Sequence, residues 1–334
     1  MNAATEANLK SQLLDRRHRL ENAIADVGEA PDLTRLLLQV DSALERMDAR
    51  SFGFCEVCKE TVDDDFLEAN PLIQYCLCRL SEQQQRALEK DIDLATRVQL
   101  ALLPKQDLRF AGWEVHYRYE PAGPVSGDYC DAVTRENGDR TLLFMLGDVS
   151  GKGVAASFLM ARLNATFRSL IDTGLPLDQL VERASRIFGE TAIASHYATL
   201  VCGKASASGE IELCNAGHCP PLLLGGDEVA PIGATGFPVG IFASSGSSGS
   251  SPYSVQNVRL APGDTLFLYS DGLTEARDER DSEFGVDRLR HFLHEHRALS
   301  ARALAAACLK EQASFLGGAP RADDLTIMVV RRAV

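Results

Sequence analysis

Near the N-terminus, apolar residues recur with the spacing of two amphipathic helices. The first stripe consists of Leu9, Leu13, Leu20 and Ile24, and the second of Leu33, Leu37, Val40, Leu44 and Met47. Gly28 and Pro31 separate the two stripes, and proline is favoured at the first position of a helix. The pattern therefore predicts an antiparallel helical hairpin.

A third apolar stripe marks the segment 81–104. It consists of Leu88, Ile92, Ala95, Val98 and Leu102. Ser81 and Gln84 are spaced as in a capping box at a helix N-terminus, and Pro104 ends the helix. The near-heptad spacing is typical of a homodimer seam or of a helix that transmits a signal between domains. Packing of this helix against its own chain fits the same spacing.

Beyond Pro104 the pattern changes to short β-rich runs interrupted by amphipathic segments. The expected strands are 113–119, 129–134, 141–149, 198–204, 210–215, 265–269 and 325–330, and the expected helices are 154–170, 177–191, 285–296 and 300–315. Helices that arrive in pairs between runs of strands indicate an antiparallel α+β domain. Serine and glycine dominate 243–252, which predicts a surface loop. We expect three parts: a helical hairpin followed by a cysteine-containing segment at 1–80, a linker helix at 81–104 and the α+β domain at 105–334.

The composition is that of an ordinary globular protein with about two domains. The chain has 334 residues, 45% of them hydrophobic, and a formal net charge of −13. This acidity argues against binding to nucleic acid or to acidic membranes. No apolar run approaches the ~20 residues that cross a bilayer, and the N-terminus lacks a signal-peptide pattern. We therefore expect a cytoplasmic protein whose nine cysteines are reduced.

Four aspartates stand at the ends of apolar runs: Asp128, Asp148, Asp271 and Asp323. Carboxylates brought together in one cleft repel one another unless cations neutralise them. Their hard oxygen atoms suit Mg²⁺ or Mn²⁺, and two such ions about 3.5–4 Å apart could activate a water for attack on phosphorus. Glycines around Asp148 let the backbone turn sharply, so the carbonyl of Val149 could be a further ligand. Taken singly, each aspartate could instead be a turn residue.

Seven motifs follow one another along the chain from residue 94 onward. They are LATRVQLALLP at 94–104, VSGDYCD at 125–131, GDVSGKG at 147–153, NAGHCPP at 215–221, GFPVGI at 236–241, SDGLTE at 270–275 and DDLT at 323–326. In this order they resemble the PPM-type metal-dependent serine/threonine protein phosphatases, in the bacterial branch of SpoIIE and RsbU. The resemblance implies a sandwich of two packed antiparallel β-sheets flanked by helices, with metal ions at one edge between the sheets.

The resemblance also implies roles for individual residues. Asp148 would bridge two Mn²⁺ or Mg²⁺ ions, and the other ligands would be Asp128, Asp271, Asp323 and the carbonyl of Val149. Asp324 would be structural, because the wider family often has asparagine at that position. The implied activity is hydrolysis of phosphoserine or phosphothreonine, and the implied partner is a phosphoprotein such as a phosphorylated anti-sigma-factor antagonist. No substrate-binding residue follows from the sequence.

The chain departs from the eukaryotic branch of this family at two positions. Ser150 stands where that branch has a histidine proposed as a general acid, and no arginine lies just ahead of Asp128 to grip phosphate. Lys152 or Arg118 could hold phosphate instead. His218 could act as a general acid, or it could be a structural histidine at the end of a strand.

Four cysteines cluster ahead of the linker helix: Cys55, Cys58, Cys76 and Cys78. Such spacing is typical of a zinc ribbon, in which Zn²⁺ stabilises a segment too small for its own core. With FGFCEVC at 52–58 and LEANP at 67–71, this part resembles the DksA/TraR-type zinc finger, which follows a helical hairpin. That pattern has a cysteine at the position of Arg79, so Cys78 would have to ligate with a local distortion. Four reduced structural thiols are the alternative.

Two other functions fit parts of the sequence. The helical hairpin and finger could bind RNA polymerase or another partner, as DksA-like proteins do, with a regulatory or inactive phosphatase domain behind them. Hydrolysis of a small phosphate ester would use the same fold and metals. The presence of all four aspartates favours an active phosphatase, because a carboxylate cluster without metals is destabilising.

Overall fold

The structure is a computed structural model that describes residues 3–27, 31–76, 78, 81–136, 140–191, 196–241 and 251–333. The chain divides into two compact units, Met1–Asp91 and Ile92–Val334. Outside the described residues lie Gly28 between the hairpin stripes, Arg79 of the finger and residues 243–250 of the segment rich in serine and glycine. No helix in the described ranges is long and apolar enough to span a bilayer.

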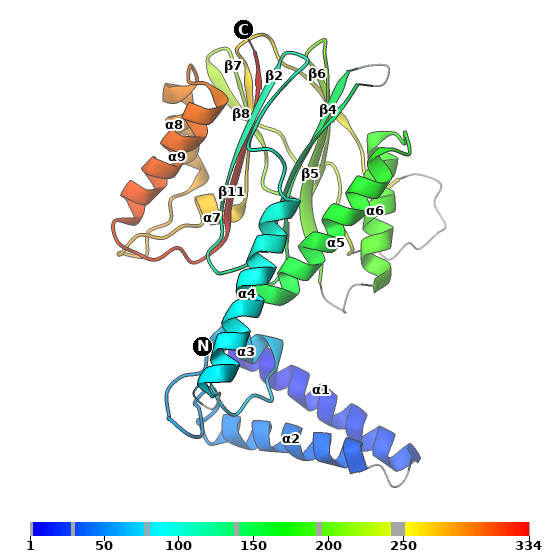
Figure 1. The fold of residues 1–334 in the computed structure, drawn as a ribbon, viewed down its shortest axis with the longest axis vertical. Coiled ribbons are helices and arrows are strands. Elements are labelled where there is room, and N and C mark those ends of the chain that lie inside the picture. The colour runs from blue at the N-terminus through cyan, green and yellow to red at the C-terminus, as the bar shows by residue number, and fades with distance from the viewer. Residues whose placement is uncertain are drawn as a thin grey trace. The chain divides into compact units, whose positions relative to one another are not determined.

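The first unit contains the predicted helical hairpin, built from α1 (Ala3–Val27) and α2 (Pro31–Asp48) (Figure 1). Lys10 pairs with Asp48 at 2.7 Å and Arg17 pairs with Asp41 at 3.0 Å, so the two helices run antiparallel. Pro31 opens α2, where its missing N–H costs no hydrogen bond. The short helix α3 (Asp64–Ala69) completes this unit. Its core consists of Leu9, Leu13, Leu20, Val40, Ala43, Leu44, Met47, Phe52, Cys55, Val62 and Leu67.

Helix α4 (Glu82–Leu102) begins at the predicted capping box. The Ser81 N–H donates to Gln84 Oε1 at 2.9 Å, and the Gln84 N–H donates to Ser81 Oγ at 3.3 Å. The boundary between the two units falls inside this helix, between Asp91 and Ile92. One continuous helix therefore belongs to both units.

The second unit contains two antiparallel sheets, as expected (Figure 1). The first has the strand order β1-β2-β11-β10-β7-β8 and the second β3-β4-β5-β6-β9. The strands are β1 (Asp107–Phe110), β2 (Trp113–Glu120), β3 (Asp128–Arg135), β4 (Thr141–Val149), β5 (Ala198–Ser206), β6 (Glu210–Ala216), β7 (Leu222–Gly225), β8 (Glu228–Pro231), β9 (Gln256–Arg259), β10 (Thr265–Tyr269) and β11 (Leu325–Arg332). The sequence pattern missed β1, β7, β8 and β9, because strands of four residues are too short to show a periodicity.

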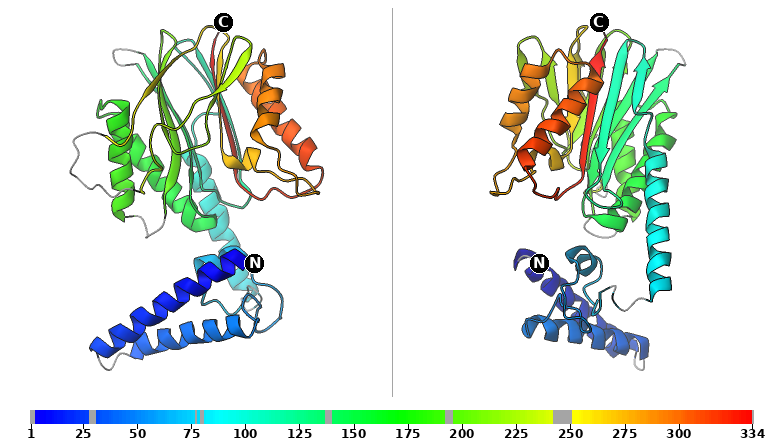
Figure 2. Two further views of the ribbon diagram at one scale, coloured as in Figure 1. Left: turned by 180° about the vertical axis from the view of Figure 1, so that it is seen from behind. Right: turned by 60° about the vertical axis from the view of Figure 1, so that its left-hand side comes forward.

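Helices cover the outer faces of both sheets (Figure 2). Helices α5 (Gly153–Ile171) and α6 (Leu177–Thr191) cover the second sheet, and α8 (Val286–His296) and α9 (Ala301–Leu316) cover the first. A further short helix, α7 (Asp271–Thr274), follows β10 directly. One apolar core lies between the two sheets, and each sheet shares another with its helices. This four-layer arrangement confirms the predicted fold class.

Candidate functional site

Two of the predicted aspartates face each other across neighbouring strands. Asp128 begins β3, Asp148 lies near the end of β4, and the two are directly paired in the antiparallel register. Side chains at paired positions lie close together on the same face of a sheet, and like charges placed there repel each other. Asp128 is fully buried, and Asp148 is partly exposed. A cation between these two carboxylates would therefore be stabilised.

The other two aspartates come from the first sheet. Strand β10 ends at Tyr269, and Asp271 begins α7 two residues later. Asp323 precedes β11, which pairs with β10 so that Tyr269 lies opposite Ile327. The end of β10 and the start of β11 therefore lie side by side at the same end of these two central strands, and both aspartates lie there.

Hydroxyl groups join the edges of the two sheets. Ser270 Oγ donates to Asp128 Oδ2 at 2.9 Å, and Thr326 Oγ1 donates to the same carboxylate oxygen. The Thr326 backbone N–H donates to Ser270 Oγ at 2.8 Å, which fixes the serine hydroxyl in turn. These bonds hold Asp128 of the second sheet against the strands that carry Asp271 and Asp323. The structure thus brings all four predicted aspartates to one place.

Burial and mutual repulsion raise the pKa values of these carboxyl groups. The pKa of Asp148 is raised to about 8, first by burial and then by the charges of Asp271 and Asp323. Burial and the charge of Asp148 raise the pKa of Asp128 well above its usual range. Burial, followed by the charge of Asp323, also raises the pKa of Asp271. A cluster that resists ionisation in this way becomes fully charged only with cations beside it.

The backbone around Gly127 shows that the predicted oxygen ligands border a common space. A Cβ atom at Gly127 would lie 2.9 Å from the carbonyl oxygen of Val149 and 3.3 Å from Asp148 Oδ1. The carbonyl and the carboxylate therefore lie side by side where no side chain fits. Carboxylate and carbonyl oxygens are the ligands that Mg²⁺ and Mn²⁺ prefer, so the donor set fits such ions.

Asp324 holds the loop that leads into β3. Its Oδ1 accepts from the Ala122 N–H at 2.8 Å, and its Oδ2 accepts from the Gly127 N–H at 2.9 Å. Both carboxylate oxygens are used in this way. The structural role that the sequence suggested for Asp324 agrees with these contacts.

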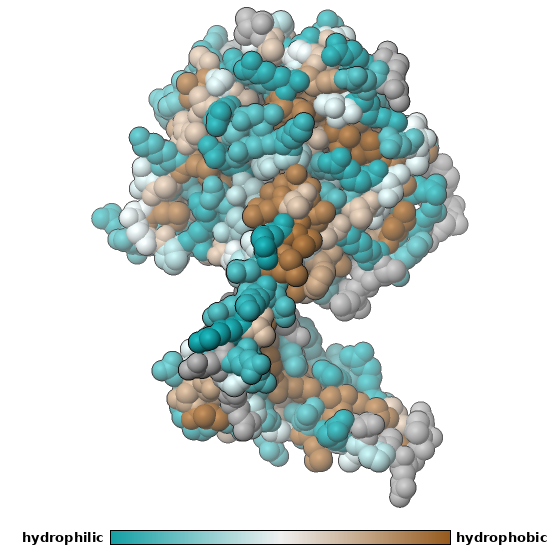
Figure 3. All heavy atoms as spheres, in the orientation of Figure 1, coloured by the Kyte–Doolittle hydropathy of each residue, from teal (hydrophilic) through white to brown (hydrophobic). Residues whose placement is uncertain are grey.

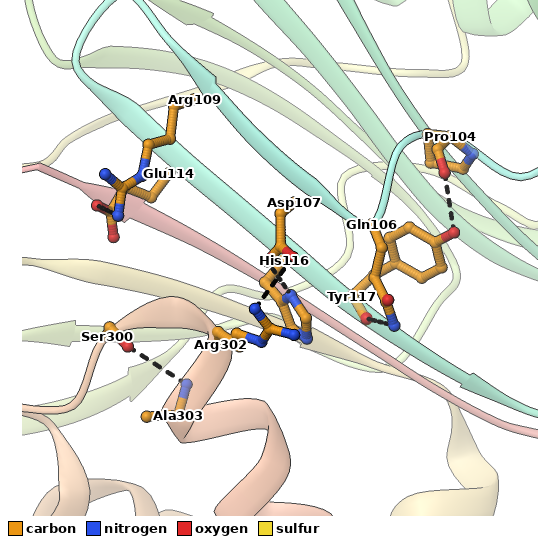
Figure 4. Close-up of polar contacts among 10 residues, drawn as sticks. All are labelled: Pro104, Gln106, Asp107, Arg109, Glu114, His116, Tyr117, Ser300, Arg302 and Ala303. Carbon is orange, nitrogen blue, oxygen red and sulfur yellow. Dashed lines mark hydrogen bonds and ion pairs between the residues drawn. The ribbon is translucent and has the colours of Figure 1, made fainter.

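The structure separates the two residues suggested as phosphate ligands. Lys152 lies at the carboxylate site, where its half-exposed Nζ is 3.3 Å from Asp323 Oδ2 and donates to the Ala322 carbonyl at 3.0 Å. Arg118 follows His116 by two residues on β2, so both side chains share one face of the sheet. That face carries the contact of His116 with Asp107, near Arg302 of α9 (Figure 4). Of these two residues, Lys152 is therefore the one that lies at the carboxylate site.

His218 is buried and contacts Thr199 and Asn215. Its Nδ1 lies 2.8 Å from Thr199 Oγ1, and its backbone N–H donates to Asn215 Oδ1 at 2.8 Å. Burial lowers the pKa of His218 to about 4, so the imidazole is neutral at pH 7 and is a poor proton donor. Ser150, at the position of the eukaryotic histidine, contacts Tyr197, whose backbone N–H donates to Ser150 Oγ at 3.0 Å.

The four N-terminal cysteines form a compact cluster. The Sγ atoms of Cys55 and Cys78 lie 3.6 Å apart, and those of Cys58 and Cys76 lie 3.4 Å apart. Tetrahedral zinc with Zn–S bonds of ~2.3 Å needs an S···S distance of about 3.8 Å. Backbone hydrogen bonds from Cys58 and Cys76 lower the pKa of the Cys55 thiol to about 6. The cluster is compact enough for Zn²⁺, and Cys78 lies with the other three cysteines despite its shifted place in the sequence.

Three residues beside Asp128 received no role from the sequence. Ser270 and Thr326 bind its carboxylate, and Gln99 of α4 binds the backbone of Ser126, two residues earlier. All three are buried polar residues within the quoted motifs. The sequence indicated these residues only by their places in those motifs, because polar side chains do not contribute to an apolar periodicity.

Comparison with known proteins finds one matching family model and relatives of similar sequence. A family model described as Stage II sporulation protein E (SpoIIE) matches residues 138–333. The chain is 26% identical over 257 residues to Phosphoserine phosphatase RsbU of Bacillus subtilis, covering 75% of this chain and 72% of RsbU. It is 26% identical over 272 residues to Protein IcfG of Synechocystis sp., covering 72% of this chain and 41% of IcfG. The chain therefore spans less than half the length of IcfG.

Solved structures show the same fold. The SiaA-PP2C domain of Pseudomonas aeruginosa is similar with a TM-score of 0.63 and 22% sequence identity. The similarity covers 76% of this chain and 99% of that domain. At this identity the likeness establishes a common fold, and the chemistry has to be argued from the residues of the site.

Proposed function

The chain belongs to the SpoIIE family, and from this premise we propose that it is a metal-dependent protein phosphatase that hydrolyses phosphoserine and phosphothreonine. The observation that carries the proposal is the convergence of Asp128, Asp148, Asp271 and Asp323 at one edge of the two sheets. The raised pKa values of three of these groups support a site that is completed by cations.

We assign the ligands of two Mn²⁺ or Mg²⁺ ions to the four aspartates and the carbonyl of Val149, with Asp148 between the ions. Bound there, the ions would supply Lewis acidity toward phosphate oxygens and lower the pKa of a water molecule. The two hydroxyl donors on Asp128 favour its charged form, which is the form that binds a cation.

Two further residues of the site, Lys152 and His218, have different roles. Lys152 is half exposed at the open edge, so its ammonium group can meet an incoming phosphate dianion. His218 is neutral and buried, which leaves protonation of the departing serine or threonine oxygen to another group. We infer that Lys152 contributes to phosphate binding and that His218 maintains the strand end next to Thr199.

We propose that the substrate is a phosphoprotein in a bacterial signalling system, such as a phosphorylated anti-sigma-factor antagonist. RsbU, with which the chain shares 26% identity, is named a phosphoserine phosphatase. The open edge supports a protein substrate, because Lys152 and Asp323 are about half exposed there. Competition between a phosphoserine protein and a small phosphate ester would separate this proposal from a small-molecule phosphatase.

The test is manganese-dependent release of phosphate from a phosphoserine protein. We expect wild-type activity that Asp148→Asn reduces at least about a thousandfold, since the bridging carboxylate is lost. Asp287→Asn provides a matched control, because Asp287 is fully exposed on α8. Activity that survives in Asp148→Asn would contradict the proposed site, and a wild-type protein inactive with both substrates would contradict the proposed function.

We further propose that the first unit binds Zn²⁺ through Cys55, Cys58, Cys76 and Cys78. The short S···S distances support a metal site built from the four cysteines. Thiolate ligands persist in a reducing compartment, so we propose a cytoplasmic location. The ion would stabilise residues 51–78, which contribute Phe52, Cys55, Val62 and Leu67 to the core of this unit.

A further inference from the structure

A pocket rich in cations lies in the first unit of the chain. Its volume is about 540 Å³, and it is lined by Arg46, Arg50, Ser51, Phe54, Cys55, Glu56 and Lys59. Three of these described residues are basic, and among them only Glu56 is acidic. Three positive charges and one negative charge leave a net charge of +2 around the pocket, although the whole chain carries −13.

Arg46 is the buried cation of this pocket. It is 9% exposed, and its guanidinium lies over the Phe52 ring, with Cζ 5.7 Å from the ring centroid. Nη1 donates to the Ile73 carbonyl at 3.0 Å, whereas the buried Nη2 has no hydrogen-bond partner in the described part of the chain. Because water screens a buried charge less than an exposed one, Arg46 attracts an anion in the pocket more strongly than a surface arginine would.

The other two cations occupy backbone positions that favour glycine. Arg50 has a φ of 54° and Lys59 a φ of 63°, both in the left-handed region. Arg50 follows the last turn of α2, and its N–H donates to the Met47 carbonyl at 3.1 Å. The Ser51 N–H donates to the Arg46 carbonyl at 2.9 Å, which completes a Schellman motif, whose left-handed position is usually glycine. Both positions thus carry a cation at a conformational cost.

The charges of Arg50 and Lys59 are not neutralised by the protein. Both residues are exposed, and across the described ranges neither side chain forms an ion pair or a hydrogen bond. In the same unit, exposed Arg17 pairs with Asp41 at 3.0 Å. The two cations of the pocket therefore remain available to a ligand.

We propose that this pocket binds a phosphate monoester dianion. Arg50 and Lys59 donate hydrogen bonds to the phosphate oxygens, and Arg46 supplies a third, buried charge. A net charge of +2 matches a phosphate dianion better than a single carboxylate. The ring of Phe54, which is 45% exposed, lies in the lining, where it contacts the organic group that carries the phosphate. This site is separate from the carboxylate site, whose aspartates all belong to the second unit.

Arg50→Gly and Lys59→Gly test the role of the two exposed cations. Each removes a charge and relieves a left-handed backbone, so the thermal midpoint without ligand should stay equal to that of wild type or rise. Asp281→Gly is the backbone control, because Asp281 has a φ of 64° and lies in the second unit. Arg19→Ala is the charge control, because Arg19 is an exposed cation of α1 outside the lining.

Calorimetric titration of the full chain, without added divalent cations, measures binding of inorganic phosphate, methylphosphonate and phenylphosphonate. The C–P bond of the two phosphonates resists a phosphatase. We expect wild type to bind all three, and phenylphosphonate most tightly. Arg50→Gly and Lys59→Gly should each weaken binding about tenfold, the equivalent of one lost charge-assisted hydrogen bond, and both controls should stay within about twofold of wild type. Phe54→Ala should weaken binding of phenylphosphonate alone.

The overturning results are equally definite. A wild-type protein that binds none of the three anions would refute the proposal, and so would glycine variants that bind as wild type does. Weaker binding accompanied in both glycine variants by a lower thermal midpoint would refute it as well, because lost folded structure would then be the cause. Equal wild-type affinities for the three anions would overturn the role of Phe54 and identify free phosphate as the ligand.

Two further measurements exclude other sources of these effects. Loss of zinc in the glycine variants with unchanged phosphate binding would overturn the proposal, because the cations would then only balance the charge of the cysteine cluster. Lys152→Ala should bind phosphate within about twofold of wild type, since Lys152 belongs to the second unit. Loss of phosphate binding in Lys152→Ala would assign the anion to the carboxylate site instead of this pocket.

Discussion

Burial and the negative charges of neighbouring aspartates both disfavour the ionised form of Asp148. Its pKa of about 8 in the absence of cations lies far above the ~3.9 of an aspartate in an unfolded chain. The folded state therefore binds this proton more tightly than the unfolded state does. We expect the contribution of Asp148 to the stability of the metal-free protein to be greatest below about pH 4 and to be lost as the pH rises through about 8.

Thermal unfolding in a chelator at several pH values between 5 and about 8 checks this expectation. The wild-type midpoint should decrease as the pH rises, and Asp148→Asn should flatten that dependence, because the amide does not titrate. Since the chelator also removes zinc, the comparison between the two proteins is the informative quantity. An equal slope in both proteins would show that Asp148 does not carry the effect.

Thr326 makes a second residue-scale prediction. Thr326→Val keeps the shape of the side chain and removes a buried donor to Asp128 Oδ2. We expect the free energy of unfolding to fall by about 1–3 kcal/mol, as for a hydrogen bond to a charged group, and manganese binding to weaken. Urea unfolding with and without Mn²⁺ measures both changes.

Thr141→Val is the control for Thr326→Val, because Thr141 is also buried and begins β4, the strand that ends near Asp148. A change of about 0.5 kcal/mol or less is expected there, with no effect on manganese binding. If both variants lost the same free energy of unfolding, replacing any buried threonine of these sheets would have that effect. The hydrogen bond from Thr326 to Asp128 would then not be the cause.

The sequence was sufficient to find the aspartates but not the groups that hold them. Asp128 and Asp148 stand beside glycines at strand ends, a pattern visible in the chain itself. Their direct pairing depends on the strand register, and Ser270 reaches Asp128 across 142 positions of sequence. In the sequence, Gln99 cannot be distinguished from the other polar residues of a mostly exposed helix. Only the fold shows that its amide contacts the backbone of Ser126.

At the scale of elements, α4 presents apolar side chains that the second unit leaves exposed. Leu94 is 53% exposed and Val98 is 55% exposed, one turn apart on the helix. Figure 3 shows hydrophobic residues gathered around the C-terminal part of α4. Of the predicted stripe, Val98 is exposed, and the other four residues are partly buried: Leu88, Ile92, Ala95 and Leu102. We propose that Leu94 and Val98 contribute to a homodimer through the segment 81–104.

Sedimentation of the full chain tests this proposal. Wild-type protein should sediment as a dimer at micromolar concentration, and the double variant Leu94→Glu with Val98→Glu should be monomeric with an unchanged thermal midpoint. Leu38→Glu on α2 is the control, because Leu38 is 64% exposed and the substitution is chemically the same. A wild-type monomer, or dissociation caused by Leu38→Glu as well, would contradict the assigned seam.

The starts of helices were predicted where a residue type is strongly favoured at one position of a helix end. Pro31 opens α2, the capping box of Ser81 opens α4, and both follow from the missing or reciprocal hydrogen bonds of helix ends. The order of strands within each sheet could not be derived from the pattern, because it depends on pairings between distant segments. The resemblance to a known family implied the sandwich of two sheets, and the strand order within each sheet became known only from the structure.

At the scale of the whole molecule, one helix follows the N-terminal thiols in the chain and leads to the domain with the carboxylate site, since α4 begins four residues after Cys78. We predict that the intact protein carries about one zinc ion per chain and that Cys58→Ser loses it. If α4 transmits the state of the first unit to Ser126, the same variant should also change the affinity of the carboxylate site for Mn²⁺.

Metal analysis of the purified protein, followed by manganese titration, distinguishes the parts of this prediction. Cys308→Ala is the control, because Cys308 is a buried thiol of α9 outside the cluster, and it should retain zinc and bind Mn²⁺ normally. If Cys58→Ser loses zinc and its manganese affinity does not change, zinc only stabilises the first unit. A change in affinity that disappears when Gln99→Leu is added would instead show that the signal passes through the Gln99 contact, because two changes on one route are not additive.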